Sequence, residues 1–176
     1  MPIFKALIFI ALMYVPQSVL AGEVEVVWHE PDNYRDVKPV MGGKERYRQN
    51  VFKQLDKHWL KLAEKHLPEG MKLKVKVTDL NLAGDVQHNF SLGQEIRLVK
   101  SIYWPSVKFE YQLFDGDRLV KEESVELKDM SFMDRGATLR VRSSFDYEKR
   151  ILTDWFVDEV EVMLAQWKRQ QTAIMS

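Results

Sequence analysis

The chain has 176 residues, with 26 Lys and Arg against 26 Asp and Glu, and it contains no cysteine. This length favours a single domain, and a hydrophobic fraction of 45% is enough to build a packed core. The lack of cysteine excludes disulfides, thiolate metal sites and cysteine nucleophiles. A formal net charge of zero argues against a general polyanion binder, so we do not expect nucleic acid as a partner.

The first 21 residues have the pattern of a secretory signal peptide. Lys5 precedes an apolar run over residues 6–15, and Pro16 separates that run from the end Val19-Leu20-Ala21. The run is shorter than the roughly 20 residues that span a bilayer. We therefore expect cleavage after Ala21 and a mature domain over residues 22–176 with no membrane span. An uncleaved N-terminal anchor and a buried N-terminal helix are the alternatives.

A strand and a long helix are predicted next. Residues 23–28 alternate, with Val24, Val26 and Trp28 on one face, as in a strand. Residues 44–67 predict a helix, which Pro68-Glu69-Gly70 ends. The apolar residues of this helix fall on one stripe: Tyr47, Val51, Phe52, Leu55, Trp59, Leu62 and Ala63.

The second predicted strand covers residues 71–77. Its apolar row is Leu73, Val75 and Val77, and lysines occupy the alternate positions, which indicates a half-exposed sheet. At Thr78 and Asp79 the alternation slips by one residue, which indicates a bulge or a strand end.

Further strands and a second helix complete the chain. Residues 95–100 and 107–113 predict strands, and Asp115-Gly116-Asp117 predicts a hairpin turn. Matching apolar rows favours a three-residue loop or a nearby bulge, with the returning strand at a sheet edge. Residues 128–144 predict a loop, residues 145–170 an amphipathic helix, and residues 171–176 a frayed tail. The stripe of this helix is Ile151, Leu152, Trp155, Phe156, Met163, Leu164 and Trp167.

This order predicts an α+β domain, strand-helix-strand-strand-strand-helix. It favours a single, mainly antiparallel sheet with two long amphipathic helices on one face.

The densest polar segment is residues 78–85, where the alternation slips. If Asp79 continues the buried row, its carboxylate needs a partner. The backbone of the turn, a base such as Arg97, or solvent at a binding site could each supply one. The candidate binding residues around this bend are Asp79, Asn81, Asp85, His88, Arg97 and Trp104.

Motifs for specific chemistries are weak. A calcium loop starting at Asp79 would need a carboxylate at position 90, where Phe90 stands. His58 and His66 are eight residues apart, whereas a helical metal pair is four apart. The sequence has no G-x-S-x-G elbow, P-loop or G-x-G-x-x-G. We therefore assign no catalytic residue, metal or cofactor.

Four segments together resemble the bacterial DUF3016 family: residues 28–36, 77–84, 128–130 and 148–156. The resemblance extends over residues 24–160. It implies an exported protein of a Gram-negative bacterium, located in the periplasm, and it supplies no catalytic residues because the family has no assigned activity.

Three function classes stay open. The favoured hypothesis is a non-enzymatic binding or interaction domain of the cell envelope, with an envelope protein or a small ligand as its partner. A deep apolar pocket would instead favour a small-ligand or lipid carrier. A cleft that gathers Asp85, His88 and Arg97 would favour a hydrolase, and an exposed Trp104 or Trp167 patch would favour docking.

Overall fold

The computed structural model describes residues 22–134 and 144–175, so the predicted signal peptide lies outside the described residues. The strands are β1 (Glu23–Trp28), β2 (Met71–Asn81), β3 (Asp85–Asn89), β4 (Gln94–Leu98), β5 (Ser106–Asp115) and β6 (Arg118–Lys128). The helical segments are η1 (Pro31–Asn33), α1 (Lys44–His66), α2 (Asp146–Trp155), η3 (Phe156–Glu161) and α3 (Val162–Met175).

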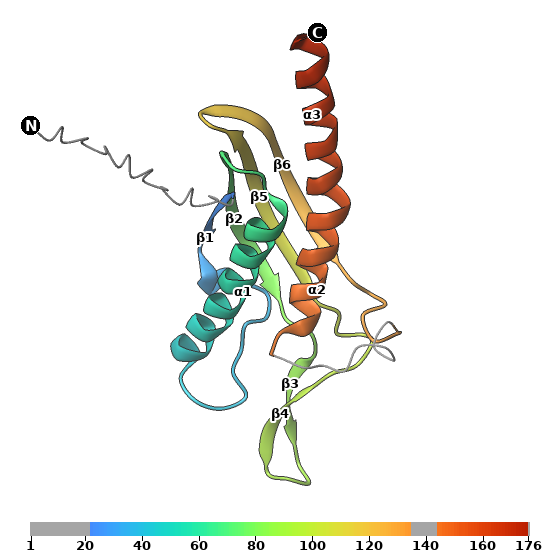
Figure 1. The fold of residues 1–176 in the computed structure, drawn as a ribbon. Helices are drawn as coiled ribbons and strands as arrows, with labels where there is room; N and C mark the ends of the chain where they lie inside the picture. The colour runs from blue at the N-terminus through green and yellow to red at the C-terminus, as the bar shows by residue number, and fades with distance from the viewer. Residues whose placement is uncertain (1–21, 135–143, 176) are drawn as a thin grey trace, which may run out of the picture.

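Four strands form one sheet in the order β1-β2-β5-β6. β1 and β2 are parallel, because α1 carries the chain back between them, and the other two pairs are antiparallel. Both long helices cover the same face of the sheet (Figure 1). The predicted α+β class, with a mainly antiparallel sheet and two helices on one face, is confirmed.

The predicted irregularities in the sheet are also present. The register of β2 against β5 shifts between Val77 and Asp79, as the slipped alternation indicates. In the β5–β6 hairpin, Asp115 lies opposite Arg118 and the register shifts beyond Leu113. The bulge, and not a longer turn, therefore aligns the apolar rows, and β6 lies at the edge of the sheet.

Aromatic side chains form the centre of the core. Trp59 of α1 and Trp155 of α2 are buried and pack edge to face with ring centroids 5.8 Å apart. Trp155 also packs on Phe109 and Tyr111 of β5, at 4.9 and 5.2 Å. Trp155, which lies on the predicted apolar stripe of its helix, is therefore buried against the sheet.

The C-terminal helix is longer than predicted, and it contains a π-helical turn. Leu152, Phe156, Val160 and Leu164 are all buried, at a spacing of four residues. In a straight α-helix this spacing drifts by about 40° per step. The wider turn of η3 opposes this drift and keeps the four residues toward the sheet. Residues 171–175, predicted as a frayed tail, continue α3 because no Gly or Pro interrupts them.

β3 and β4 pair only with each other and form a separate two-stranded hairpin. The sequence predicts a strand near β4 but not β3, and it does not predict a second sheet. The hairpin projects from the end of the main sheet (Figure 1). None of the described helices has the length and apolar character needed to cross a bilayer.

Candidate functional site

The long connections of the chain gather at one end of the sheet. β1 and β2 end there, β5 begins there, and β6 ends there, so the loops after β1, β2 and β6 meet at this edge (Figure 1). We call this region the loop end and define it by residues 29–43, 82–105 and 129–134. Binding residues are found disproportionately on loops that a rigid scaffold positions, and all six predicted site residues lie at or next to this end.

Asp79 is held by the loop that follows β1. Its Oδ1 accepts the backbone N–H of Arg35 at 2.9 Å, and its Oδ2 lies 3.4 Å from the Arg35 guanidinium. The carboxylate is therefore partnered, but by Arg35 and not by the turn near Gly84 or by Arg97. Burial, together with the nearby Asp79 charge, raises the pKa of the Tyr34 hydroxyl above its ordinary range.

Arg97 joins the base of the hairpin to the β1 loop. One guanidinium nitrogen lies 2.9 Å from Oδ2 of Asp36 and donates to the Gly84 carbonyl at 3.1 Å. The other donates to the Lys38 carbonyl at 2.9 Å. Both side chains of the ion pair are largely buried, 16% and 10% exposed. Gly84 adopts a φ of +84°, and a Cβ there would lie 2.9 Å from the Leu98 carbonyl, so this position requires glycine.

Glu148, at the start of α2, is the most buried carboxyl in the described residues, with 2% of the residue exposed. Its Oε1 accepts the backbone N–H of Ala83 at 2.6 Å, which ties the helix to the end of β2. Burial raises the pKa of Glu148, and the Ala83 N–H and the charge of Arg97 oppose that rise.

A second buried ion pair anchors the loop after β6. Arg150 of α2 lies 2.9 Å from Oδ2 of Asp129 and donates to the Phe132 carbonyl at 2.9 Å. The side chains of the pair are 14% and 8% exposed. Asp79 and Glu148 therefore hold the β1 loop and the end of β2, Arg97 with Asp36 joins the hairpin to the β1 loop, and Arg150 with Asp129 joins the loop after β6 to α2.

The remaining predicted residues hold the base of the hairpin or stand on it. Asn81 donates to the Trp104 carbonyl at 2.7 Å, and the Trp104 side chain is half-buried. Asp85 accepts a hydrogen bond from Gln87 at 3.1 Å. His88 lies farther along the hairpin, exposed, with its ring 4.9 Å from that of Phe90. Asp85, His88 and Arg97 therefore have three different partners and do not converge on one point.

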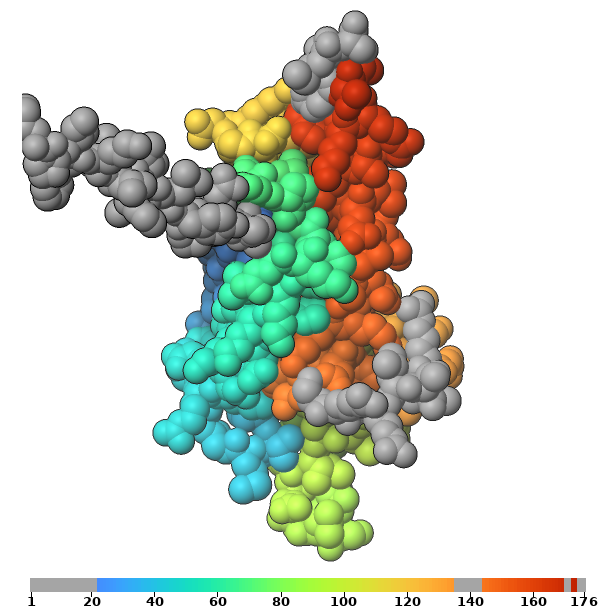
Figure 2. All heavy atoms as spheres, in the orientation of Figure 1, coloured from blue at the N-terminus to red at the C-terminus, as the bar shows by residue number. Residues whose placement is uncertain are grey.

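Apolar side chains are exposed at the tip of this hairpin, which protrudes beyond the rest of the molecule in Figure 2. Phe90 is 90% exposed and Leu92 is 62% exposed. Among the described residues, twelve large apolar side chains are exposed, and seven of them belong to the loop end. These seven are Met41, Phe90, Leu92, Val99, Ile102, Met130 and Met133. These exposed apolar side chains make the loop end the part of the molecule that most resembles a contact surface.

Sequence reasoning missed three of these groups. Glu148 lies four residues before Leu152, on the buried stripe of its helix, and this position could have revealed it. Asp36 gives no such signal, because its partner is 61 residues away in the chain. Phe90 and Leu92 lie in a turn, where an apolar residue carries no periodic signal.

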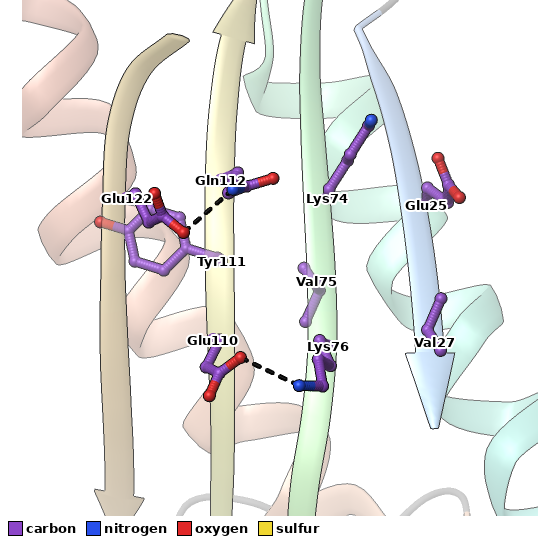
Figure 3. Close-up of a pocket in the computed structure, with 9 residues that line it drawn as sticks. All are labelled: Glu25, Val27, Lys74, Val75, Lys76, Glu110, Tyr111, Gln112 and Glu122. Carbon is purple, nitrogen blue, oxygen red and sulfur yellow. Dashed lines mark hydrogen bonds and ion pairs between the residues drawn. The ribbon is translucent and has the colours of Figure 1, made fainter. Parts of the chain in front are cut away.

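A shallow depression of about 220 Å³ lies on the open face of the sheet (Figure 3). Charged side chains dominate its lining, and two polar contacts cross it: Lys76 with Glu110 at 3.3 Å and Gln112 with Glu122 at 2.9 Å. A charged surface of this kind does not suit an acyl chain, whose binding requires apolar walls. In residues 22–134 and 144–175 no group of three or more potential ligands is placed to hold a metal ion.

Residues 22–158 match the family described as "Protein of unknown function (DUF3016)". The chain belongs to the DUF3016 family. The four segments of the predicted resemblance are in contact at the loop end. Asp36 pairs its backbone with Leu80 and Leu82, Glu148 binds Ala83, and Arg150 binds Asp129. Comparisons with curated proteins and with solved structures gave no match.

Proposed function

We propose that this DUF3016 protein is a non-enzymatic interaction domain of the cell envelope and that it docks through the loop end. The observation that carries the proposal is the β3–β4 hairpin, which presents Phe90 and Leu92 to solvent at 90% and 62% exposure. An exposed apolar group of this kind is stabilised when a partner removes it from water.

The buried ion pairs support the same function. Arg97 with Asp36 ties the hairpin to the loop after β1, and Arg150 with Asp129 ties the loop after β6 to α2. A surface held in one arrangement loses less conformational entropy on binding than a surface that must first become ordered.

Export to the periplasm is part of the proposal. It rests on the signal-peptide pattern of residues 1–21 and on the resemblance described above. The intact mass of protein recovered from the periplasm tests it. We expect an N-terminus at Gly22, and any other N-terminus contradicts the proposed cleavage after Ala21.

Retention in the envelope tests the docking function. Cells producing the wild type, Phe90→Ser/Leu92→Ser or Leu119→Ser are submitted to osmotic shock, and the released and retained fractions are compared. Leu119 is a matched control, since it is 47% exposed near the turn of the β5–β6 hairpin, which lies at the opposite end of the sheet.

We expect the wild type and Leu119→Ser to stay with the envelope fraction and the tip variant to be released. The same distribution for all three proteins would refute docking through the tip. The hydrolase gains no support from Asp85, His88 and Arg97, because each has a different partner. A carrier would use the open depression of about 480 Å³ beside Trp28, Phe52 and Leu60.

A further inference from the structure

α1 carries a row of four lysines on its exposed side. Lys53, Lys57, Lys61 and Lys65 follow one another at a spacing of four residues, and all four are exposed. Side chains four residues apart are neighbours on a helix, so the row contains three like-charge pairs, each of which destabilises the helix. The row is therefore unfavourable for the folded protein by itself, which points to a partner of opposite charge.

The charge of this row is not neutralised by the part of the domain that the structure describes. Within residues 22–134 and 144–175, none of the four ammonium groups forms an ion pair. Two carboxylates lie on the same stretch of α1. Asp56 accepts the indole N–H of Trp28 at 3.0 Å, and Glu64 is exposed and forms no ion pair with a described residue. The formal net charge of zero therefore conceals a local excess of positive charge.

A pocket of about 330 Å³ lies beside the middle of the row, between α1 and the first turn of α2. The two helices lie side by side on the face shown in Figure 2. The described lining residues are Gln54, Lys57, His58 and Lys61 of α1 with Asp146 and Lys149 of α2. Asp146 and Lys149 have interactions elsewhere in the protein, so the uncompensated charge of the pocket comes from Lys57 and Lys61.

Hydrogen bonds hold the two walls of the pocket together. The Thr153 hydroxyl donates to the Lys149 carbonyl at 2.8 Å, so its oxygen accepts the Nε2–H of His58, also at 2.8 Å. This contact joins α1 to α2 and fixes the orientation of the imidazole. The Lys149 ammonium group donates to the Ser144 carbonyl at 2.6 Å, which positions its side chain as well. The pocket is therefore formed before a ligand arrives, which lowers the entropic cost of binding.

We propose that this pocket binds a phosphate group of a small anionic ligand, with Lys57 and Lys61 as the principal binding residues. A phosphate group carries up to two negative charges, and lysines bind it as point charges. Successive lysines of the row are about 6 Å apart along the helix axis, which favours a ligand whose second phosphate contacts Lys53 or Lys65. The inference is independent of the docking function, because no described lining residue of the pocket belongs to the loop end.

Calorimetric titration at low ionic strength tests the inference, with pyrophosphate, phosphate and acetate as probes. The site variant is Lys57→Gln/Lys61→Gln, in which both substituted side chains are exposed. The matched control is Lys72→Gln/Lys74→Gln, which removes the same number of charges from β2. Lys74 lines the depression on the open face of the sheet, on the side away from the helices.

We expect the wild type and the control to bind pyrophosphate more tightly than phosphate, and acetate most weakly. The site variant should bind pyrophosphate about tenfold more weakly, because two exposed ion pairs together contribute about this factor. Pyrophosphate should also raise the Tm of the wild type and the control more than the Tm of the site variant. Without ligand, the site variant should melt at or above the Tm of the wild type, since it loses all three like-charge pairs.

Equal pyrophosphate affinities of the two double variants would overturn the inference, and so would a rise in Tm that sodium chloride reproduces at the same ionic strength. Either result would show general screening of charge and no site.

The source of the phosphate group is distinguished with phosphatidylcholine vesicles that contain phosphatidic acid. Flotation of the wild type and the control, but not of the site variant, would identify a lipid headgroup. Binding of pyrophosphate at the site without flotation would identify a soluble ligand.

Discussion

The ion pair between Arg97 and Asp36 should be a major source of stability for the loop end. Arg97→Ala removes a buried cation that lies 2.9 Å from Asp36 and donates to the Gly84 and Lys38 carbonyls. Among the described residues, the Asp36 carboxylate would then keep only the Lys38 N–H, at 3.2 Å, as a hydrogen-bond donor. Removing one partner of a buried pair costs about 3–5 kcal/mol. That loss is a large share of a typical stability of about 5–15 kcal/mol.

A double-mutant cycle in urea measures this interaction. We expect Arg97→Ala and Asp36→Ala each to lower the free energy of unfolding, and the double variant to lose less than the sum, by about 1–3 kcal/mol. The control cycle uses Lys76 and Glu110, whose side chains are 45% and 53% exposed and whose coupling should be about 0–1 kcal/mol. Additive effects at Arg97 and Asp36, or a coupling no larger than the control, would refute the reasoning.

Three further substitutions test the scaffold. Trp155→Ala should lower the unfolding free energy by roughly 3–5 kcal/mol, because the ring is buried against β5; an unchanged urea midpoint would contradict this packing. Asp79→Asn should lower stability by about 1 kcal/mol through the weakened contact with Arg35, and an equal or higher Tm would contradict it. Burial raises the pKa of Glu148 in the folded state above the ordinary glutamate value of 4.5, so the wild type should lose stability relative to Glu148→Gln as pH rises above that ordinary value. If the difference in unfolding free energy between the two proteins stays constant with pH, or changes in favour of the wild type, then ionising Glu148 does not destabilise the folded state.

The sequence predicted the elements whose apolar pattern is local. The stripe of α1 and the alternation in β2 each depend on residues within a few positions, and both elements formed as expected. The slip at Thr78 and Asp79 revealed a bulge for the same reason, since one displaced residue moves every following side chain to the other face.

The contacts of the loop end were beyond prediction from local pattern. The bend at residues 79–85 was identified as the place to examine, but Arg97 binds Asp36 and not Asp79. Pairings between distant loops follow from how three connections pack together, and no sequence spacing encodes them. The hairpin escaped notice because an exposed two-stranded ribbon has no buried face, so β3 shows no run of alternating apolar residues.

The most direct test of the central claim is photo-crosslinking in living cells. A photoreactive amino acid replaces Ser91 at the hairpin tip or Asp117 at the opposite hairpin turn, and each protein is irradiated in the native host. Docking through the loop end predicts adducts with an envelope lipid or protein from position 91, their loss when Leu92→Ser is added, and none from position 117. Equal adducts from both positions, or none from position 91, would contradict it.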